Sequence, residues 1–526
     1  MKHPTSPSVI ARLAAGVVAL VLATAVAAVL PGVAGASSPG AQGASSKSLR
    51  VLVGSVFEWS AGLDPATNPI SAADAIYEDA IYGDLFLQKA DGTIVPDLAS
   101  GYSQSNAGKT WTITLRRGVT FSDGTPFDAQ AVAANIKRDL EPQLACICLP
   151  NFPISSITTP NSYTVVVNLT KAFAPFIAGF LDESPNWTVN PTALAKMGEQ
   201  AYKLKPIGAG PFEVVTDDVN SQLVLKRNPN YWRKGDPKLD TLTFSTVGTD
   251  QSAYSAMVSG QGQVYLSLGT QSMVPTVKKQ FRLTPVSTNQ PAIVQLNTTA
   301  PPFNNILARE AIYYATDTKA LTKGVLGTSK YVDQSLEGPG GRFYQQKVPG
   351  YRTYDLAKAK ALVKQLGGLS VNYLIGNTAN AAIVPEALQA QWAKAGIKVK
   401  LDPVAITSLI QAYTSNSWTM AGAQSGGFDP ALIPGLAFRF ASNARFTGVK
   451  DPTLDRMMDQ GAGTLNMAAR TKIYHQIFAY VASHAYAPVL YAAPTAWTVT
   501  DHNVTSRVGL TSTNTVAVDW GGVTVK

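Results

Sequence analysis

The pattern of hydrophobic and polar positions predicts several strands along the chain. Residues 49–53 and 397–401 alternate between the two kinds of position. Trp111, Ile113 and Leu115 share one face of a further expected strand. This period of two is typical of strands that bury one face against a core.

Apolar residues at three- and four-residue spacing predict helices between the strands. An apolar stripe runs from Asp355, which can cap a helix, to Leu366, before Gly367 ends the pattern. A second helix is expected near Pro385, and a third over residues 470–482. Strand, helix and strand alternate, which is typical of βαβ units in a mixed or parallel sheet. The sequence therefore predicts an α/β body with more than one lobe.

The amino-terminal segment has a different pattern. Lys2 and Arg12 precede an apolar or small run over residues 13–30, and Ala34 and Ala36 fit the small-x-small pattern of a signal-peptide cleavage site. We expect a secretory signal peptide cleaved after about Ala36. A retained membrane anchor is the alternative, because the apolar run approaches the length of a spanning helix. In either case the protein is expected in the periplasm or on the outer face of the cytoplasmic membrane, without a lipid anchor, since no cysteine stands at this junction.

Composition narrows the class of protein. The chain has 526 residues, of which 45% are hydrophobic and 15% charged, which excludes a disordered chain and allows two to four domains. Loss of residues 1–36 would remove two basic residues and no acids, lowering the net charge from +9 to +7. The basic residues form only isolated pairs such as Arg116-Arg117, so we expect no binding to nucleic acid.

The sequence gives little support for a metal site or for catalysis. His475 and His484 are nine residues apart on an expected helix and would point to opposite faces. Cys146 and Cys148 are two apart, and a local disulfide and two buried thiols both remain open. We expect no cofactor, no metal site and no catalytic residue.

Several longer blocks of sequence carry a resemblance to a known family. They are PDLASGY (96–102), KTWTITLRRGVTFSDGTPF (109–127), PIGAGPF (206–212), LKRNPNYW (225–232), LNTTAPPF (296–303) and REAIYYA (309–315). In this order they closely resemble the signature of the family 5 extracellular solute-binding proteins, the peptide/nickel-type substrate receptors of ABC importers. The similarity spans residues 49–520.

The resemblance implies a hinged, type II periplasmic-binding-protein-like fold, with two lobes and an extra domain inserted in lobe I. The implied division is a signal peptide (1–36), a flexible linker (37–48), lobe I (49–92, 206–288 and 489–526), the inserted domain (93–205) and lobe II (289–488). Solute would bind between the lobes, and closure would present the loaded protein to the permease.

Within the signature blocks a structural explanation is favoured over ligand contact. Trp111, Phe121 and Phe127 are expected in the core of the inserted domain, and Asp123-Gly124 in a turn. These residues identify the family, but they do not identify the ligand.

The resemblance places ligand contacts in the loop after the first strand, near the hinge strands and in a lobe II loop, QSGGFDP (424–430). The candidates are Phe57, Glu58, Trp59, Asn297, Asn377, Ser425, Gly427, Phe428 and Asp429. Aromatic faces and hydrogen-bonding groups suit peptide side chains or sugar rings. Structural explanations stay open as well: Trp59 packed against its lobe, a satisfied Asn297, and Asp429 as a helix cap.

Two departures argue against a zwitterionic dipeptide as the ligand. Gly426 stands where dipeptide receptors carry the carboxylate that pairs with the α-amino group. Residues 376–382 are uncharged where those receptors carry an arginine.

The sequence therefore predicts a monomeric, exported, non-enzymatic receptor of an ABC importer. It would capture oligopeptides or peptide-like solutes and deliver them to the transmembrane subunits of a permease. An oligosaccharide receptor of the same fold is the first alternative, and a secreted hydrolase is the alternative from another class.

Overall fold

The computed structural model describes residues 47–54, 62–67, 71–89, 93–141, 144, 152–181, 183–286, 289–377, 379–427, 429–432, 435–494, 496–506 and 518–526. The expected signal peptide and nearly all of the expected linker lie outside these residues. No helix within them combines the length and the apolar character needed to cross a membrane.

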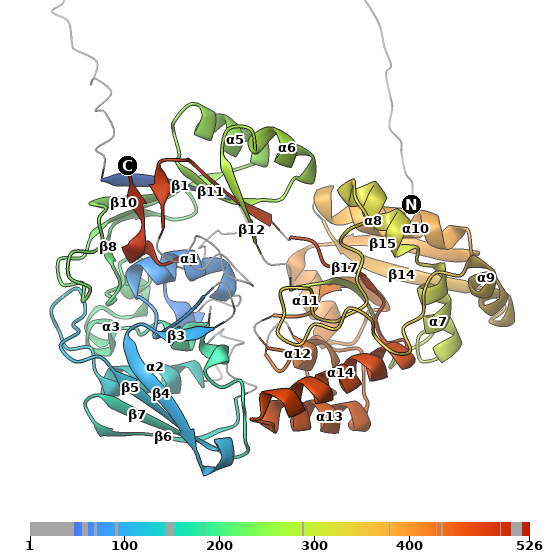
Figure 1. Cartoon of the computed structure of the whole chain (residues 1–526), viewed down its shortest axis with the longest axis horizontal. Coiled ribbons are helices and arrows are strands. Elements are labelled where there is room, and N and C mark those ends of the chain that lie inside the picture. The colour runs from blue at the N-terminus through green and yellow to red at the C-terminus, as the bar shows by residue number, and fades with distance from the viewer. Residues whose placement is uncertain are drawn as a thin grey trace, which may run out of the picture. The chain divides into compact units, whose positions relative to one another are not determined.

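The first sheet has seven strands, with the first strand of the chain at its centre (Figure 1). Its spatial order is β12 (Arg282–Val286), β18 (Ala496–Thr500), β11 (Val264–Leu268), β1 (Ser48–Gly54), β10 (Thr241–Val247), β9 (Gln222–Arg227) and β8 (Phe212–Asp218). β1 runs parallel to β10 and β11, and the other neighbours are antiparallel. Because side chains alternate along β1, Val51 packs with α1 (Ser71–Ile81), and Leu52 packs on the other face with α5 (Asp250–Val258) and α6 (Val274–Val277).

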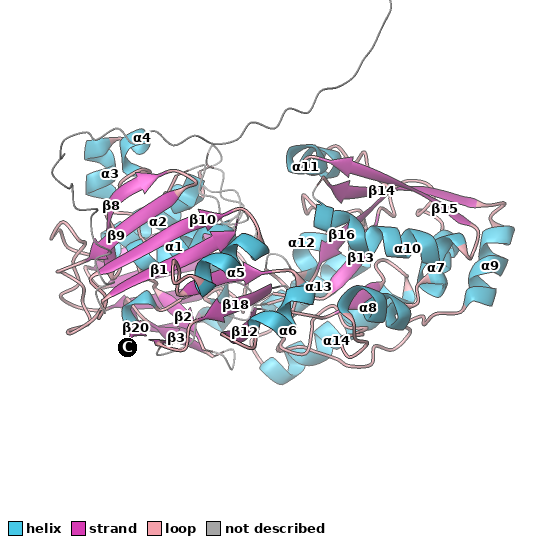
Figure 2. Cartoon of the chain, turned by 90° about the horizontal axis from the view of Figure 1, so that it is seen from above, coloured by secondary structure: helices cyan, strands magenta, loops and turns pink. Residues whose placement is uncertain are grey.

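The second sheet has five strands and helices on both faces (Figure 2). Its order is β15 (Ile397–Val404), β14 (Leu369–Gly376), β16 (Met420–Gln424), β13 (Ala292–Leu296) and β17 (Val489–Tyr491). One face packs with α7 (Ile306–Ala315), α8 (Thr318–Leu326), α9 (Leu356–Gln365) and α10 (Ile383–Ala393). The other packs with α11 (Ile406–Thr414), α12 (Leu436–Phe440), α13 (Pro452–Gly463) and α14 (Met467–Ser483).

A third sheet lies between β3 and β8 in the chain. Its order is β4 (Ala99–Ser105), β5 (Thr110–Leu115), β7 (Thr164–Leu169) and β6 (Ile154–Asn161), and α2 (Ala129–Asp139) packs against one face. Trp111, Phe121 and Phe127 are in this core, at most 5% exposed, so the structural explanation of these signature residues is confirmed. Asp123 and Gly124 form the expected turn, with Gly124 at φ +85°.

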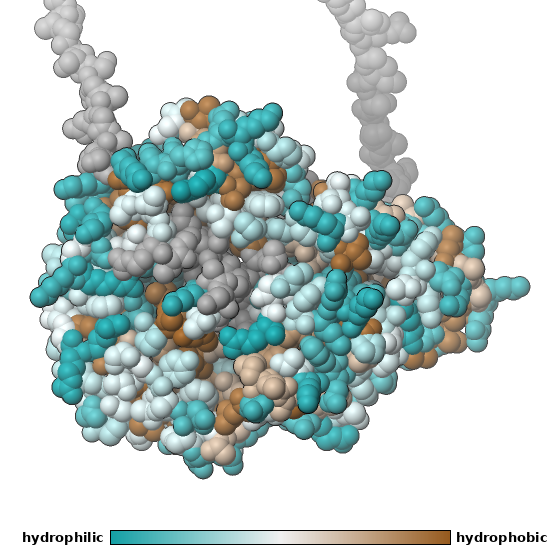
Figure 3. Space-filling view, in the orientation of Figure 1, coloured by the Kyte–Doolittle hydropathy of each residue, from teal (hydrophilic) through white to brown (hydrophobic). Residues whose placement is uncertain are grey.

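Shorter elements complete the described fold. They are the strand pairs β2 (Phe86–Gln88) with β3 (Ile94–Pro96) and β19 (Val504–Thr505) with β20 (Thr524–Val525), and the helices α3 (Pro191–Met197) and α4 (Glu199–Tyr202). On the face drawn in Figure 3, hydrophobic residues form separate groups among hydrophilic ones. This distribution agrees with apolar cores buried on both faces of the two large sheets.

Two segments carry the chain between the first and second sheets. Residues 287–291 join β12 to β13, and residues 492–495 join β17 back to β18. β12 pairs with β18 and β13 with β17, so the two crossing segments start from neighbouring strands in each sheet. Val489–Tyr491 belongs to the second sheet in the structure, whereas the sequence-based division counts these residues with lobe I.

Candidate functional site

Strand direction brings several candidate residues to one edge of the second sheet. β14, β15 and β16 run parallel, so their carboxyl ends meet at what we call the carboxyl edge. Asn377 follows β14, and Ser425, Gly427 and Asp429 follow β16. Ala292 of β13 pairs with Gln424, so the first crossing segment meets the sheet at the same edge. Ligands of open α/β sheets bind outside the carboxyl ends of parallel strands.

Ser425 is the first residue after β16 and is fully buried, at 0% exposure. Its backbone N–H donates to the carbonyl of Pro291 at 3.1 Å, which ties the loop to the crossing segment. Its hydroxyl has no hydrogen-bond partner among the described residues. An unpaired buried hydroxyl costs about 1–3 kcal/mol, so this group is suited to bonding a solute that enters here.

The next residue, Gly426, approaches the crossing segment too closely for a side chain. Gly426 has φ +87°, and a Cβ on it would lie 1.9 Å from the carbonyl oxygen of Asn289. The Asn289 amide donates to the carbonyl of Gly427 at 2.8 Å and holds the loop in this position. A side chain at position 426, acidic or not, cannot fit this backbone.

Asp429 has an internal partner. Its Oδ1 lies 2.6 Å from Nη2 of Arg470 and accepts from the backbone N–H of Ala431 at 3.0 Å. Asp429 and Arg470 are 4% and 2% exposed, and Nη2 of Arg470 also donates to the hydroxyl of Tyr474. The carboxylate is thus neutralised inside the protein and fixes the loop after β16 to α14.

Two arginines at this edge were not predicted from the sequence as site residues, although the sequence pattern around each of them is unusual. Arg470 lies three residues before Ile473 on the apolar stripe of α14, and Arg439 stands between Phe438 and Phe440 in α12. A charge inside an apolar stripe indicates a specific partner, and this signal could have found both residues.

The chain matches a known protein family over most of its length. The model of the bacterial extracellular solute-binding proteins, family 5, matches residues 93–444. The chain belongs to this family. The resemblance drawn from the signature blocks is therefore confirmed, and this solute-binding protein is a substrate receptor of an ABC importer.

Individual relatives agree with this assignment. The glutathione-binding protein of Salmonella paratyphi A is 32% identical over 366 residues, covering 68% of this chain and 69% of the relative. The nickel-binding periplasmic protein of Escherichia coli K12 is 26% identical over 468 residues, covering 82% and 88%. The structure of the periplasmic binding protein DppA from Helicobacter pylori, in complex with the peptide STSA, has a TM-score of 0.76 at 20% identity and covers 91% and 98%. The expected periplasmic-binding-protein-like α/β fold is confirmed.

Asn297 lies at the opposite edge of the second sheet in this solute-binding protein. It follows the far end of β13, roughly 15 Å along the strand from the carboxyl edge. Asn297 is 1% exposed; its amide donates to Asn416 and to the carbonyl of Trp418, and its oxygen accepts from Thr299. Every polar atom of the side chain is satisfied internally, so the structure supports the satisfied, structural explanation of Asn297.

A shallow hollow of about 380 Å³ lies at the same far edge of this sheet. Its lining includes Pro302, Ser370, Asn372 and Lys398. Ser370 and Asn372 belong to β14 and Lys398 to β15, near the beginnings of these strands. The hollow is therefore separate from the residues gathered at the carboxyl edge.

Other expected residues lie outside the part that the structure describes. They are Phe57, Glu58, Trp59, Phe428, Cys146 and Cys148. Phe57, Glu58 and Trp59 follow β1, and this strand is parallel to two neighbours in the first sheet. Asn377, which is described, is exposed at the end of β14.

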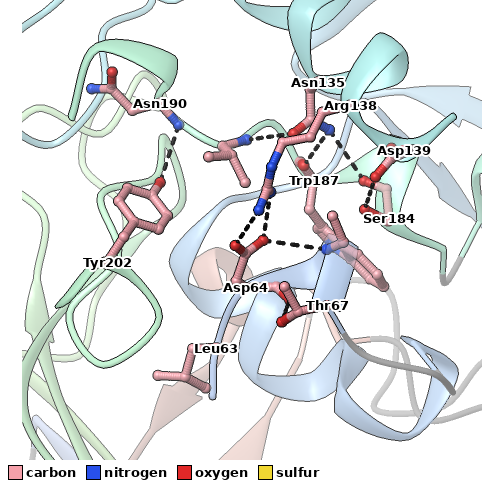
Figure 4. A network of polar contacts seen from close by, with 12 residues as sticks. Leu63, Asp64, Thr67, Asn135, Arg138, Asp139, Ser184, Trp187, Asn190 and Tyr202 are labelled. Atoms are coloured by element: carbon pink, nitrogen blue, oxygen red, sulfur yellow. Dashed lines mark hydrogen bonds and ion pairs between the residues drawn. The ribbon is translucent and has the colours of Figure 1, made fainter. Parts of the chain in front are cut away.

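A second polar network joins α2 to the segment before α1 (Figure 4). Asp64 accepts two hydrogen bonds from the guanidinium of Arg138, at 2.6 and 2.8 Å. Next to it, Asp139 accepts from the hydroxyl of Ser184 at 2.6 Å, and burial raises the pKa of Asp139 to about 7. These contacts are internal and form a structural junction.

Residues of the signature blocks also take part in an internal junction. The guanidinium of Arg116 lies 4.2 Å from the ring centroid of Trp232, and Arg233 pairs with both Asp97 and Asp519. These contacts connect residues far apart in the chain, which explains why the signature blocks identify the fold. Among the described residues no group of three or more His, Cys, Asp or Glu side chains has the geometry of a metal site.

Proposed function

We propose that this receptor captures peptides or peptide-like solutes at the carboxyl edge and delivers them intact to the transmembrane subunits of an ABC permease. The observation that carries the proposal is the buried, unpartnered hydroxyl of Ser425 beside a crossing segment. A hydroxyl can both donate to and accept from a solute amide. The protein acts as an exported monomer and performs no covalent chemistry.

Gly427 and Asn377 complete the described part of the proposed contact set. Phe57, Glu58, Trp59 and Phe428 remain predicted contacts. The two crossing segments supply the hinge between the lobes. A solute that bonds both lobes at once has a higher affinity for the closed state than for the open state, and it therefore stabilises the closed state. The first crossing segment is fastened to the binding loop by Asn289, so closure and loop position are coupled.

Two of the similar proteins support a peptide solute, although another relative binds nickel. One relative binds glutathione, a tripeptide, and one neighbour in fold was solved with the peptide STSA. The exclusion of a side chain at position 426 removes one countercharge for an α-amino group, which favours binding through neutral hydrogen bonds.

Native mass spectrometry of the freshly purified protein is the direct test. We expect a co-purified solute with the mass of a short peptide, released intact on denaturation. Calorimetric titration with mixed tripeptides should then show saturable binding, and a linear oligosaccharide of similar length should show none. Binding of the oligosaccharide alone would overturn the peptide assignment, and recovery of fragments after incubation would make the protein a hydrolase.

A further inference from the structure

Arg439 lies in α12, beside β13 and β16 of the second sheet (Figure 2). Its Nε donates to the carbonyl of Gln424 at 3.0 Å, which places the guanidinium at the carboxyl edge. Ser425, with its unpartnered hydroxyl, is the next residue in the chain. The guanidinium carbon also lies 4.9 Å from the ring centroid of Phe438, which restricts the orientation of the side chain.

Arg439 differs from the paired arginines of the protein. Arg138, Arg233, Arg352 and Arg470 each form an ion pair with a carboxylate at 2.7 Å or less. No carboxylate of a described residue lies within 4.0 Å of Arg439, and no bond to a described residue occupies its two terminal nitrogens.

The surroundings of Arg439 do not favour an isolated charge. The side chain is half-buried, and burial lowers the pKa of its guanidinium, although Tyr413 opposes this shift. The hydroxyl of Tyr413 donates to Gln295 at 3.3 Å, so this neighbour supplies no anion. A guanidinium withdrawn from water without a counter-ion is destabilising, and a bound anion would remove that penalty.

We propose that Arg439, together with Ser425, binds a carboxylate group of the solute. The terminal nitrogens of a guanidinium form a planar fork that matches the two oxygens of a carboxylate. Ser425, which follows Gln424 in the chain, adds one hydroxyl donor at the same edge. The receptor therefore takes a solute with a free carboxylate, such as the carboxyl end of a peptide or an acidic side chain. This inference rests on the proposed function and specifies the solute class at the same site.

The test compares matched probes that differ only at the carboxylate. Mixed tripeptides with free carboxyl ends and the same tripeptides as carboxyl-terminal amides are titrated into the full protein by calorimetry. We expect the acids to bind about 10- to 100-fold more tightly than the amides, the range typical of a charged hydrogen-bonded pair. Arg439→Gln should reduce this ratio to near one, and Arg439→Lys should retain part of it.

Arg445→Gln is the matched control. Arg445 is exposed, lies near Phe446, and follows α12 by a few residues, so its loss should leave the ratio unchanged. If Arg439→Gln does not fold, the wild-type acid-to-amide ratio and the Arg439→Lys variant decide the question. Equal binding of acids and amides by the wild-type protein, or an unchanged ratio in Arg439→Gln, would overturn the proposal.

Two further arms separate this inference from the proposed function. A panel of small dicarboxylates is tested by thermal shift on wild type and Arg439→Gln. Stabilisation that depends on Arg439, without binding of any peptide, would support the carboxylate subsite while the peptide function fails. The acid-to-amide ratio of Glu58→Gln is compared with that of the wild-type protein. A preference for acids in the variant but not in the wild type would overturn the subsite, because it would show that Glu58 is the partner of Arg439.

Discussion

Asn297 and Ser425 lie at opposite edges of the second sheet and are both buried, but their side chains differ in how they are bonded. At the far edge, Asn297 is buried and every polar atom of its side chain has a protein partner. At the carboxyl edge, Ser425 is equally buried with no partner for its hydroxyl, and Arg439 has no counter-ion among the described residues. A buried polar group with a complete set of bonds supports the fold, whereas one without partners requires another explanation, and for Ser425 we propose a bound solute.

Asp429→Ala should have the largest effect on stability, because Asp429 stabilises the fold although it lies at the carboxyl edge. Its removal leaves the buried guanidinium of Arg470 without a carboxylate, and we expect the free energy of unfolding to fall by about 3–5 kcal/mol in urea. Asp459→Ala is the control, since its pair with Lys171 is exposed and should contribute less than about 1 kcal/mol. A stable Asp429→Ala protein that loses only solute binding would instead make this carboxylate a ligand contact.

Gly426→Ala tests the close approach of the binding loop to the hinge. We expect a loss of about 2–3 kcal/mol in unfolding free energy, because a positive φ and the Asn289 carbonyl both oppose a Cβ. Gly124→Ala has a similar φ of +85° with nothing within 4 Å, so it should lose only about 1 kcal/mol. Equal losses in the two variants would show that the backbone contact at Asn289 plays no part.

Asn297→Ala should lower the unfolding free energy by about 2 kcal/mol, because it removes the donor to the carbonyl of Trp418, one donor to Asn416 and the acceptor of the Thr299 hydroxyl. Urea denaturation measures this loss. Solute affinity, measured by calorimetry on the folded variant, should stay within about twofold. A marked loss of affinity with unchanged stability would show that Asn297 is a ligand contact after all.

The pH dependence of Glu337 gives a smaller effect at the carboxyl edge. Burial raises the pKa of Glu337 to about 8, and its Oε2 accepts from the backbone N–H of Phe343 at 2.8 Å. The folded protein therefore holds this proton more tightly than the unfolded chain, so stability from this group is lost as the pH rises from about 4.5 to 8. Glu337→Gln should flatten this decline by at least about 1 kcal/mol in urea denaturation across that pH range.

Glu386→Gln is the control for that series, since Glu386 is an exposed glutamate in the first turn of α10. Its stability profile should follow that of the wild-type protein. An identical decline in Glu337→Gln would mean that another group causes it.

Ser425→Ala should not lower stability: no internal hydrogen bond is lost, and removal of an unpaired buried hydroxyl should raise the unfolding free energy by up to about 1 kcal/mol. Affinity for the solute should fall about five- to tenfold, as expected for one lost hydrogen bond. Ser425→Ala and Asn297→Ala thus predict opposite patterns in the same two measurements. A stability loss in Ser425→Ala without a change in affinity would contradict the assignment of the two edges.

Much of the fold could be predicted because local patterns agree with it. The stripe after Asp355 became α9 with Asp355 as its N-cap, and the alternation from Ile397 became β15. The helix predicted over residues 470–482 is longer, Met467–Ser483, because Asn466 caps it by accepting from the N–H of Ala469. End positions depend on such side-chain bonds, which periodicity does not show.

The candidate site was less predictable. The loop after β16 could be found from the resemblance, but the roles of its residues could not. Asp429 looked available to a ligand because its partner Arg470 is 41 residues away in the chain. Arg439 went unnoticed because its isolation depends on the absence of nearby carboxylates among residues brought together only by folding.

The amino-acid sequence by itself determined the secondary structure, the family and the general kind of protein, since periodicity and ordered blocks are local properties of the chain. Only the tertiary structure decided which polar groups are satisfied and which are left without a partner. The physical reason is that hydrogen bonding and charge pairing between distant segments depend on distances of a few ångströms, and strand direction alone placed Asn297 and Ser425 at opposite edges of one sheet.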